Sequence, residues 1–417
     1  MSEANTGADK DQSNGSSTGP SRVLHPDTLA VRAGTDRSQF GEHSEALFLT
    51  SSFVYKNAAQ AAARFSGDEA GPIYSRFTNP TVDMLQKRLA ALEGGEACIV
   101  TGSGMSAIMG SCMSLLKAGD HIISAKALFG ATTTLFNTIF ARFGVTTTYV
   151  SLTQPEEFAA AITPNTKLIY LESPANPLTE VADIRAISKI ARAHGVILIV
   201  DNCIASPTLQ QPLALGADIV VHSATKYIDG QGRVLAGAVI GSAQYINDAM
   251  FNYVRTAGPT LSAFNAWLLL KSLETLPVRM ARHCESALKI ATWLESHPKI
   301  NRVFYPGLAS HPQYAVSCSQ QSLGGGMISV ELKASDAQQG QARAWSMIDH
   351  CKVWSITGNF GDARSTITHP ATTTHARVGE AARLAAGLTT SMLRLSVGLE
   401  HPDDLIADLR TGLDLAV

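Results

Sequence analysis

Two ionisable residues follow apolar segments that have the length and composition of buried strands. Asp201 comes directly after VILIV (196–200), and Lys226 lies shortly after DIVVH (218–222). Ligands of open parallel sheets bind at the carboxyl ends of the strands, so we expect the two side chains to lie at the same edge. A buried lysine loses its proton more readily, and its amine can then form a Schiff base with an aldehyde. A nearby carboxylate can keep a pyridine nitrogen protonated, so that the ring accepts electrons from a carbanion.

Each residue also has a simpler interpretation. Asp201 could cap the loop that follows it, and Lys226 could be a solvated loop lysine, which is the commonest environment of that residue type. A Walker-B-like role for Asp201 lacks its partner motif, because the sequence contains no GxxxxGK[ST] phosphate loop. The two residues together, each after a predicted buried strand, therefore favour a shared site more than either does alone.

Two further segments have features of phosphate ligands. Ser223 and Thr225 place two hydroxyls just before Lys226, and TGSGMSAI (101–108) follows a predicted strand and opens a predicted helix. The glycine spacing fits the dinucleotide fingerprint, which also requires an acidic residue at the end of the next strand. Asp120 instead precedes that strand, so only half of the fingerprint is present. Small residues that expose amides at a helix N-terminus can bind a single phosphate equally well. An NAD-dependent dehydrogenase remains an alternative, and it predicts nicotinamide binding.

Short β-branched segments alternate with helical segments over the first part of the chain. Strands are predicted at 97–101, 121–124, 146–150, 167–171, 196–200, 218–222 and 236–241, with helices between them at 105–117, 130–142 and 183–194. This alternation indicates an α/β fold with a mostly parallel sheet covered on both faces. A helical stretch at about 262–296 leads to a smaller α+β block, with strands near 326–332, 352–356 and 392–396 and helices near 337–349, 378–386 and 402–413.

Composition excludes several classes of function. The 417 residues carry a net charge of −2, which removes a sequence-wide electrostatic argument for nucleic acid or an anionic membrane as partner. No apolar run approaches the ~18 residues that span a bilayer, and the polar N-terminal segment does not resemble a signal peptide. The six cysteines form no CxxC pair. These features predict a cytoplasmic protein.

The three segments around residues 101–108, 201 and 226 resemble, in this order, the Cys/Met-metabolism family of fold-type-I pyridoxal-phosphate (PLP) enzymes. The resemblance extends from about Leu24 to the C-terminus. Further matching motifs are YSRFTNPT (74–81), LFG (128–130), ESPANP (172–177), HPATTTH (369–375) and LRLSVGLEH (393–401). It implies a large PLP-binding domain with a mostly parallel sheet and a smaller C-terminal α+β domain.

The resemblance also implies domain boundaries. Residues 1–21 are expected to be a disordered tail, and 22–80 an N-terminal arm that contributes to the neighbouring subunit's site. The PLP-binding domain is expected to span 81–277, and the C-terminal domain 278–417.

The resemblance further implies roles for individual residues. Lys226 forms the Schiff base with PLP and moves protons, while Asp201 pairs with the pyridinium nitrogen. The phosphate is held by the amides of Gly104 and Met105 and the hydroxyls of Ser223 and Thr225, Phe129 stacks on the ring, and Asn176 bonds its phenolic oxygen. Asn176 could equally be a turn residue between two prolines, and a core phenylalanine is the less favoured alternative for Phe129.

Other matching positions imply contacts to substrate and to a second subunit. Arg394 binds the substrate α-carboxylate, and Asn359 lies beside the substrate. Tyr74 and Arg76 reach the phosphate in the neighbouring subunit, so a homotetramer with shared sites is expected. No metal is expected, because the three histidines that could suggest one lack ligand-like spacing: His369, His375 and His401.

Within the family, HSATKYIDGQGR (222–233) and RTAGPTLSAFNAW (255–267) are most similar to the branch that acts on acylated homoserine with sulfide. The implied reaction is γ-replacement, which converts O-succinyl-L-homoserine and sulfide to L-homocysteine and succinate in methionine biosynthesis. Gly358 and Asn359 stand where cystathionine enzymes of the family carry Glu-Ser, which weakens the case for cystathionine chemistry. Alternatives are cystathionine γ-synthase, O-acetylhomoserine sulfhydrylase, methionine γ-lyase and an inactive regulatory subunit with the PLP fold.

Overall fold

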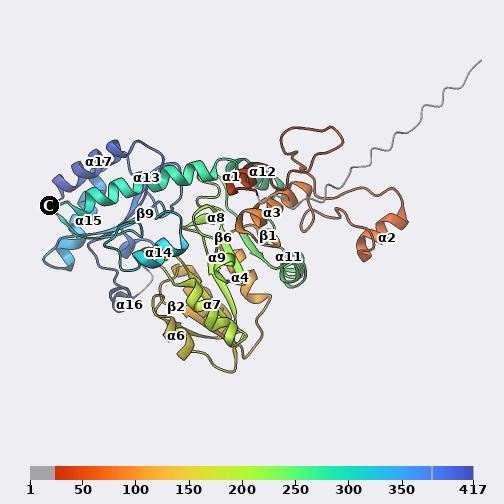
Figure 1. Cartoon of the computed structure of the whole chain (residues 1–417), viewed down its shortest axis with the longest axis horizontal. Helices are drawn as coiled ribbons and strands as arrows, with labels where there is room; N and C mark the ends of the chain where they lie inside the picture. The colour runs from red at the N-terminus through yellow and green to blue at the C-terminus, as the bar shows by residue number, and fades with distance from the viewer. Residues whose placement is uncertain (1–23, 377–378, 417) are drawn as a thin grey trace, which may run out of the picture.

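The computed structural model describes residues 24–376 and 379–416, and the predicted tail at 1–21 lies outside them. Its larger sheet has seven strands in the order β1-β7-β6-β5-β4-β2-β3 (Figure 1). β7 runs antiparallel to both of its neighbours, and the other adjacent pairs are parallel. The mostly parallel sheet is therefore confirmed. In chain order the strands are β1 (Ala97–Thr101), β2 (His121–Ala125), β3 (Thr146–Val150), β4 (Thr166–Glu172), β5 (Ile197–Asp201), β6 (Ile219–Ser223) and β7 (Gly237–Gly241).

Helices cover both faces of this sheet, which explains why its central strands are apolar on both sides. One face packs on α4 (Gly104–Met113), on the π-helical segments η1 (Leu135–Phe140) and η2 (Ile246–Met250), and on α11 (Phe251–Ala257). The other face packs on α3 (Pro80–Glu93), α6 (Pro155–Ala160), α7 (Ile184–Ala193), α8 (Ser206–Leu209), α9 (Pro212–Leu215) and α12 (Ala263–Leu273).

Two predicted helices are divided in the structure. The helix expected at 130–142 consists of α5 (Gly130–Thr134) followed by η1. The stretch at 262–296 breaks after α12, and α13 (Leu276–Glu295) begins with Pro277 in its first turn. Proline lacks the N–H that would continue the α12 hydrogen-bond ladder, but it is accepted at a helix start.

The smaller sheet has five strands in the order β10-β11-β12-β9-β8, and α13, α15 (Ala337–His350) and α17 (Pro402–Leu415) pack against one face. Its strands are β8 (Ile300–Phe304), β9 (Met327–Leu332), β10 (Ser355–Ile356), β11 (Thr366–Thr368) and β12 (Met392–Ser396). The other face meets a loop of the larger sheet, since Ser329 Oγ donates to the Pro177 carbonyl at 2.5 Å. The strand expected at 352–356 is confined to 355–356, and β8 and β11 were not predicted.

Six shorter helices complete the described residues: α1 (Pro26–Arg32), α2 (Ala58–Ser66), α10 (Ala243–Tyr245), α14 (Tyr314–Gln320), the 3-10 helix η3 (Pro370–Thr372) and α16 (Glu380–Ala385). Among the described residues, none of the helices combines the length and apolar character needed to cross a lipid bilayer.

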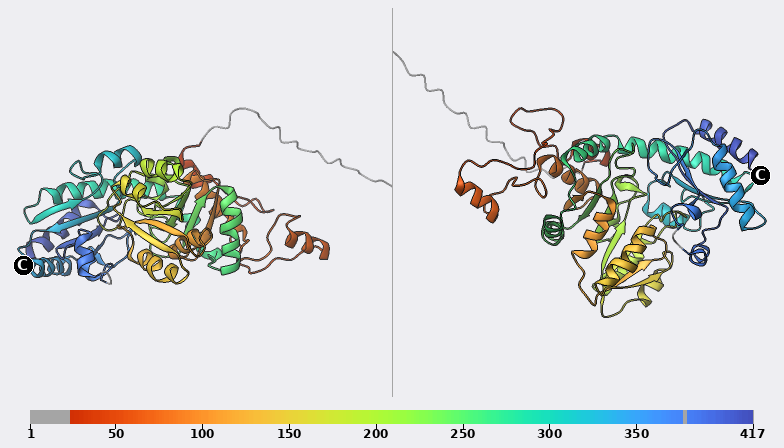
Figure 2. Two further views of the ribbon diagram at one scale, coloured as in Figure 1. Left: turned by 90° about the horizontal axis from the view of Figure 1, so that it is seen from below. Right: turned by 180° about the vertical axis from the view of Figure 1, so that it is seen from behind.

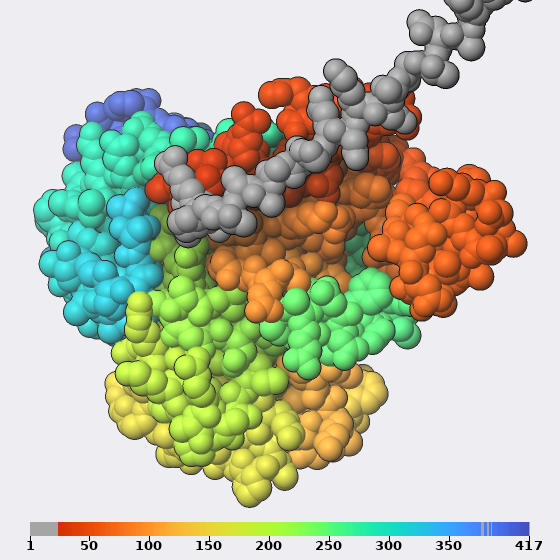
Figure 3. Space-filling view, turned by 45° about the vertical axis from the view of Figure 1, so that its right-hand side comes forward, coloured from red at the N-terminus to blue at the C-terminus, as the bar shows by residue number. Residues whose placement is uncertain are grey.

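Part of the segment between α1 and α3 projects from the rest of the chain, whereas α1 itself packs on α3 and α13. Figures 2 and 3 show the part around α2 (Ala58–Ser66) as a lobe that projects from the body. None of the α2 residues is buried. Large apolar side chains of this segment face solvent, including Phe40 and Val54, which are 84% and 99% exposed. Such exposed apolar side chains are typical of a surface that another chain covers.

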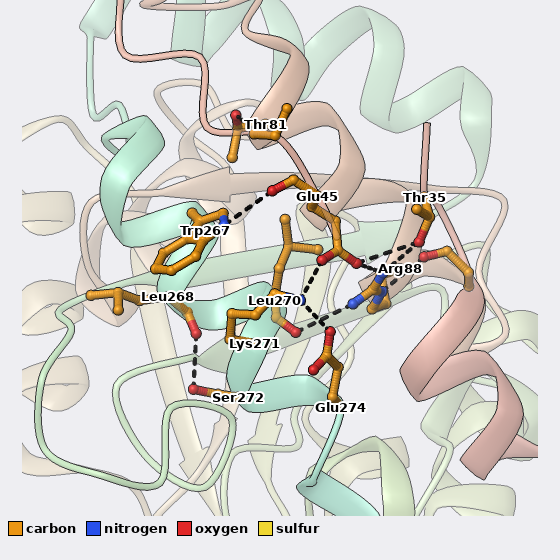
Figure 4. A network of polar contacts seen from close by, with 12 residues as sticks. Thr35, Glu45, Thr81, Arg88, Trp267, Leu268, Leu270, Lys271, Ser272 and Glu274 are labelled. Atoms are coloured by element: carbon orange, nitrogen blue, oxygen red, sulfur yellow. Dashed lines mark hydrogen bonds and ion pairs between the residues drawn. The ribbon is translucent and has the colours of Figure 1, made fainter. Parts of the chain in front are cut away.

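One buried carboxylate fastens this segment to the body. Glu45 pairs with Arg88 of α3 at 2.5 Å and with Lys271 of α12 at 2.6 Å (Figure 4). Trp267 Nε1 donates to the Glu45 carbonyl at 3.1 Å. Burial raises the pKa of Glu45, but the hydrogen bonds from Lys271 and Arg88 outweigh it and bring the pKa down to about 2.

Glu45→Gln should therefore lower the free energy of unfolding by about 3–5 kcal/mol at neutral pH, because it leaves the buried guanidinium of Arg88 without its anion. A carboxylate whose folded-state pKa is depressed contributes stability above its ordinary pKa. The difference between variant and wild type should shrink as the pH falls from 4.5 to about 2. Urea denaturation at several pH values measures it, with Glu285→Gln as the control, because that carboxylate forms an exposed pair with Arg282. Equal stability of Glu45→Gln and wild type at neutral pH would contradict the prediction.

Candidate active site

Four of the residues singled out in the sequence form one hydrogen-bonded chain. Lys226 Nζ donates to Asn359 Oδ1. Arg394 donates to Asn176 Oδ1 at 3.1 Å and to the carbonyls of Gly358 and Asn359 at 2.8 and 3.0 Å. The loops after β4 and β6, the segment before β11 and the strand β12 are thus joined at one place between the two sheets.

Alternation along β12 aims Arg394 at this place. Leu393 and Leu395 belong to the core beneath α13, α15 and α17, so Arg394 points from the opposite face of the strand. Arg394 is 1% exposed, so its guanidinium does not face solvent. A buried guanidinium with fixed donors is suited to a carboxylate.

The surroundings of Lys226 favour its neutral form. Burial lowers the pKa of Lys226, and the positive charge of Arg394 lowers it further. The ring of Phe360, 4.8 Å from Nζ to the ring centroid, acts in the opposite direction, because an aromatic face attracts the protonated amine. The amine can therefore take up and release protons nearer neutral pH than an exposed lysine does.

Asp201 ends β5 and is aligned with Val221 of the adjacent strand β6. Tyr170 donates its hydroxyl to Asp201 Oδ2 at 3.3 Å, and the Cys203 N–H donates to Oδ1 at 3.0 Å. Burial raises the pKa of Asp201 to about 6. Because burial destabilises the charge of the Asp201 carboxylate, this group should bind strongly to a cation that enters the site.

The predicted phosphate ligands lie around the start of α4. A Cβ on Gly104 would stand 2.7 Å from Ser223 Cβ, so only glycine leaves room where α4 meets the end of β6. Met105 follows in the first turn, where helical N–H groups are free of intrahelical partners. The Thr225 hydroxyl donates to the Ala236 carbonyl at 3.3 Å, and the same hydroxyl accepts from the Ala236 N–H at 3.1 Å.

Sequence reasoning missed one carboxylate in this site. Glu172 ends β4, is aligned with Asp201 across the parallel pair and is 4% exposed. Its oxygens accept from the N–H groups of Phe129 at 3.1 Å and Asn176 at 2.9 Å. The signal was available, because KLIYLE (167–172) has a charged residue directly after a buried strand, as VILIVD does.

Phe129 and the two arm residues have different surroundings. The Phe129 side chain is 39% exposed, so its ring is available for stacking. Arg76 donates to the Arg255 carbonyl and accepts from the Thr260 hydroxyl at 2.8 Å through its own carbonyl. Tyr74 and Arg76 line a cavity of about 530 Å³ beside the 258–263 segment. Within this protomer they therefore belong to a surface distinct from the Lys226 network.

Comparison with known proteins adds to this geometry. Residues 27–414 match the Cys/Met metabolism PLP-dependent enzyme family. The chain belongs to that family. The matched residues include every strand of the larger and the smaller sheet. Solved structures of similar sequence have the same fold.

Three relatives illustrate the similarity of this Cys/Met-metabolism enzyme to others. It is 52% identical over 387 residues to the O-succinylhomoserine sulfhydrylase of Pseudomonas aeruginosa, covering 93% of this chain and 94% of that one. It is 41% identical over 389 residues to the L-methionine gamma-lyase of Fusobacterium nucleatum subsp. polymorphum, covering 93% and 97%. A structure from Campylobacter jejuni, with N′-Pyridoxyl-Lysine-5′-Monophosphate, is 34% identical with a TM-score of 0.89 and covers 94% and 100%.

Pyridoxal 5′-phosphate is the cofactor of this enzyme family, and the residues present fit it. A buried amine of lowered pKa suits its aldehyde, and the buried carboxylate of Asp201 suits its ring nitrogen. The space kept open by Gly104 at a helix start suits its phosphate.

Proposed function

We propose that this enzyme converts O-succinyl-L-homoserine and sulfide to L-homocysteine and succinate. The observation that carries the proposal is the 52% identity, over 93% of the chain, to an O-succinylhomoserine sulfhydrylase. The methionine gamma-lyase relative is 41% identical over a similar length. The partly buried network of Lys226, Asn359 and Arg394 supports an amino-acid substrate, because it combines a proton carrier with a carboxylate receptor.

Arg394 binds the α-carboxylate of the substrate in this proposal. Its guanidinium now donates to two carbonyls and one amide, and a carboxylate accepts stronger, charge-assisted bonds from the same fork. Asn359 lies between Arg394 and Lys226, so it orients both side chains toward one substrate.

Lys226 binds the cofactor aldehyde and then carries protons at the substrate Cα and at the carbons beyond it. The bound PLP supplies the electron sink that stabilises negative charge at Cα. The lowered pKa of Lys226 lets the free amine accept the Cα proton near neutral pH. Protons then move between Cα and the neighbouring carbons, succinate leaves the γ-carbon, and sulfide adds in its place.

The remaining side chains hold the cofactor. Asp201 pairs with the ring nitrogen, Phe129 stacks on the ring, and Asn176 bonds the phenolic oxygen. The phosphate is bound by the start of α4 and the loop after β6, through Gly104, Met105, Ser223 and Thr225.

The enzyme further acts as a homotetramer in which the arm completes a neighbouring site. The projecting segment with exposed Phe40 and Val54 supports this assembly, as does the exposure of Tyr74 at 43%. Tyr74 and Arg76 then reach the phosphate bound by the adjacent subunit. A solution mass of a single chain would contradict the arrangement.

Steady-state rates test the reaction. O-succinyl-, O-acetyl- and O-phospho-homoserine are each supplied with sulfide or with cysteine, and homocysteine and cystathionine are quantified. We expect kcat/KM for the succinyl donor with sulfide to exceed every other combination by about ten-fold or more, as pocket contacts can provide. A preference for cysteine would favour a cystathionine γ-synthase, and α-ketobutyrate release from methionine would favour a methionine γ-lyase.

A further inference from the structure

A single buried carboxylate joins the loops that follow two neighbouring strands, β2 and β4. Glu172 Oε2 accepts from the Phe129 N–H at 3.1 Å, in the loop after β2. Glu172 Oε1 accepts from the Asn176 N–H at 2.9 Å, in the loop after β4. One loop carries the ring proposed to stack on the cofactor, and the other carries the amide proposed to bond it.

Neither N–H group has another acceptor among residues 24–376 and 379–416, where no backbone carbonyl bonds either one. Phe129 also precedes α5 without a side-chain cap. Its ring is 39% exposed, so side-chain packing restrains it only partly. The Phe129 backbone is therefore held at two points, by Glu172 at its N–H and by α5 at its carbonyl, which accepts from the Thr132 N–H at 2.9 Å.

Hydrogen bonds connect Glu172 to the residues proposed to bind the substrate. Asn176, held through its N–H by Glu172, accepts from Arg394 through its side-chain oxygen. Arg394 in turn contacts the carbonyl of Asn359, whose side chain accepts from Lys226. A shift of the Asn176 backbone would thus be transmitted to the residues that hold substrate and cofactor.

Burial destabilises the negative charge of Glu172. Burial raises the pKa of Glu172 to about 8, and the negative charge of Asp201 adds to the shift. The N–H groups of Asn176 and Phe129 and the charge of Arg394 oppose it. Glutamine would avoid the charge, but its side-chain oxygen would serve one N–H while its NH₂ group faced the other. Only a carboxylate accepts from both loops at once.

We propose that Glu172 is a positioning residue whose carboxylate sets the stacking ring of Phe129 and the amide of Asn176 relative to each other. The proposal rests on the proposed function only for the roles of those two residues toward PLP.

Hydrogen exchange followed by mass spectrometry on the full chain tests this anchor, the pair of hydrogen bonds to Glu172, directly. In cofactor-free Glu172→Gln, amides of peptides within 126–132 and 173–178 should exchange about ten-fold faster than in wild type, because the single oxygen of glutamine can accept from only one of the two N–H groups. Exchange elsewhere and the unfolding temperature should change little. Glu180→Gln is the matched control, because it removes a half-buried carboxyl from the same loop region that accepts from neither N–H.

The bound cofactor gives a second readout that general destabilisation would not produce. The dissociation constant for PLP should rise about ten-fold in Glu172→Gln, and the visible circular dichroism of the bound cofactor should change in shape. Glu172→Asp keeps the charge with a shorter reach, so it should restore part of both effects, and it carries the test if Glu172→Gln does not fold.

The proposal would be overturned if Glu172→Gln exchanged at wild-type rates in both segments. If only Glu172→Asp folds, the same result in that variant would overturn it. The exchange is measured without cofactor or substrate. A chain that made no homocysteine could therefore still show the anchor, and an active chain could still lack it.

Discussion

Lys226→Ala should lower the kcat for homocysteine formation by about 10⁴-fold or more. Positioned acid–base catalysis alone contributes roughly 10²–10⁴-fold, and the variant also loses the covalent attachment of the cofactor. Borohydride reduction of wild type should place a pyridoxyl group on the peptide that contains Lys226, and the variant should carry none. Lys167→Ala is the control, because Lys167 lies exposed on β4. A label on another lysine, or an active Lys226→Ala, would reject the assignment.

Lys226→Arg separates charge from proton transfer. Arginine keeps a positive charge near Asn359 and the ring of Phe360, but it is not deprotonated in proteins. We expect it to be as inactive as the alanine variant while it preserves the fold. Activity well above that of Lys226→Ala would show that the charge of this side chain contributes more than its proton transfer.

Asp201→Asn should lower kcat/KM by roughly 10²–10⁴-fold. Loss of one partner from a buried ion pair costs about 3–5 kcal/mol, and each 1.36 kcal/mol is a factor of ten. The amide oxygen can still accept from the Cys203 N–H, so the local backbone should remain in place. Asp218→Asn is the control, since Asp218 accepts from the Leu198 N–H at the amino end of β5, away from the candidate site at its carboxyl end. A kcat/KM within three-fold of wild type would contradict the pairing of Asp201 with a cation.

Asp201→Asn should also change how the free energy of unfolding of the cofactor-free chain depends on pH. Burial raises the pKa of Asp201 from 3.8 to about 6, so its ionisation in the folded state costs stability as the pH rises through that range. Asp201→Asn does not ionise. Relative to wild type it should therefore gain stability between pH 4 and 6 and keep that gain at higher pH, as urea denaturation at each pH would measure.

Much of the larger sheet could be predicted because its strands are buried on both faces. Each of the seven predicted segments is a strand, with ends displaced by no more than one residue. Apolar composition identifies such strands without any tertiary information. β8 and β11 escaped prediction because β8 (INRVF) has polar residues at two of its five positions and β11 has only three residues. Their strand conformation depends on pairing with neighbours that the local sequence does not specify.

The site could be predicted in part for a similar reason. Lys226 and Asp201 follow buried strands, so the edge at which they lie was predictable. The contact between Lys226 and Asn359 spans 133 residues and depends on how the two sheets pack. The double acceptor role of Glu172 likewise depends on loops whose backbone N–H groups carry no sequence signature.

The antiparallel direction of β7 affects the edge of the larger sheet at which the proposed phosphate ligands and Lys226 lie. Because β7 is antiparallel to both neighbours, β1 and β6 point the same way although a strand separates them. The start of β7 then occupies the gap between their carboxyl ends, where a Cβ on Gly237 would overlap the Ser103 carbonyl oxygen. A strand that begins with glycine thus lets the backbone at Ser103, directly before α4, approach the start of β7 closely. The close approach brings the start of α4 and the end of β6, the two segments proposed to bind the phosphate, to the same edge of the sheet.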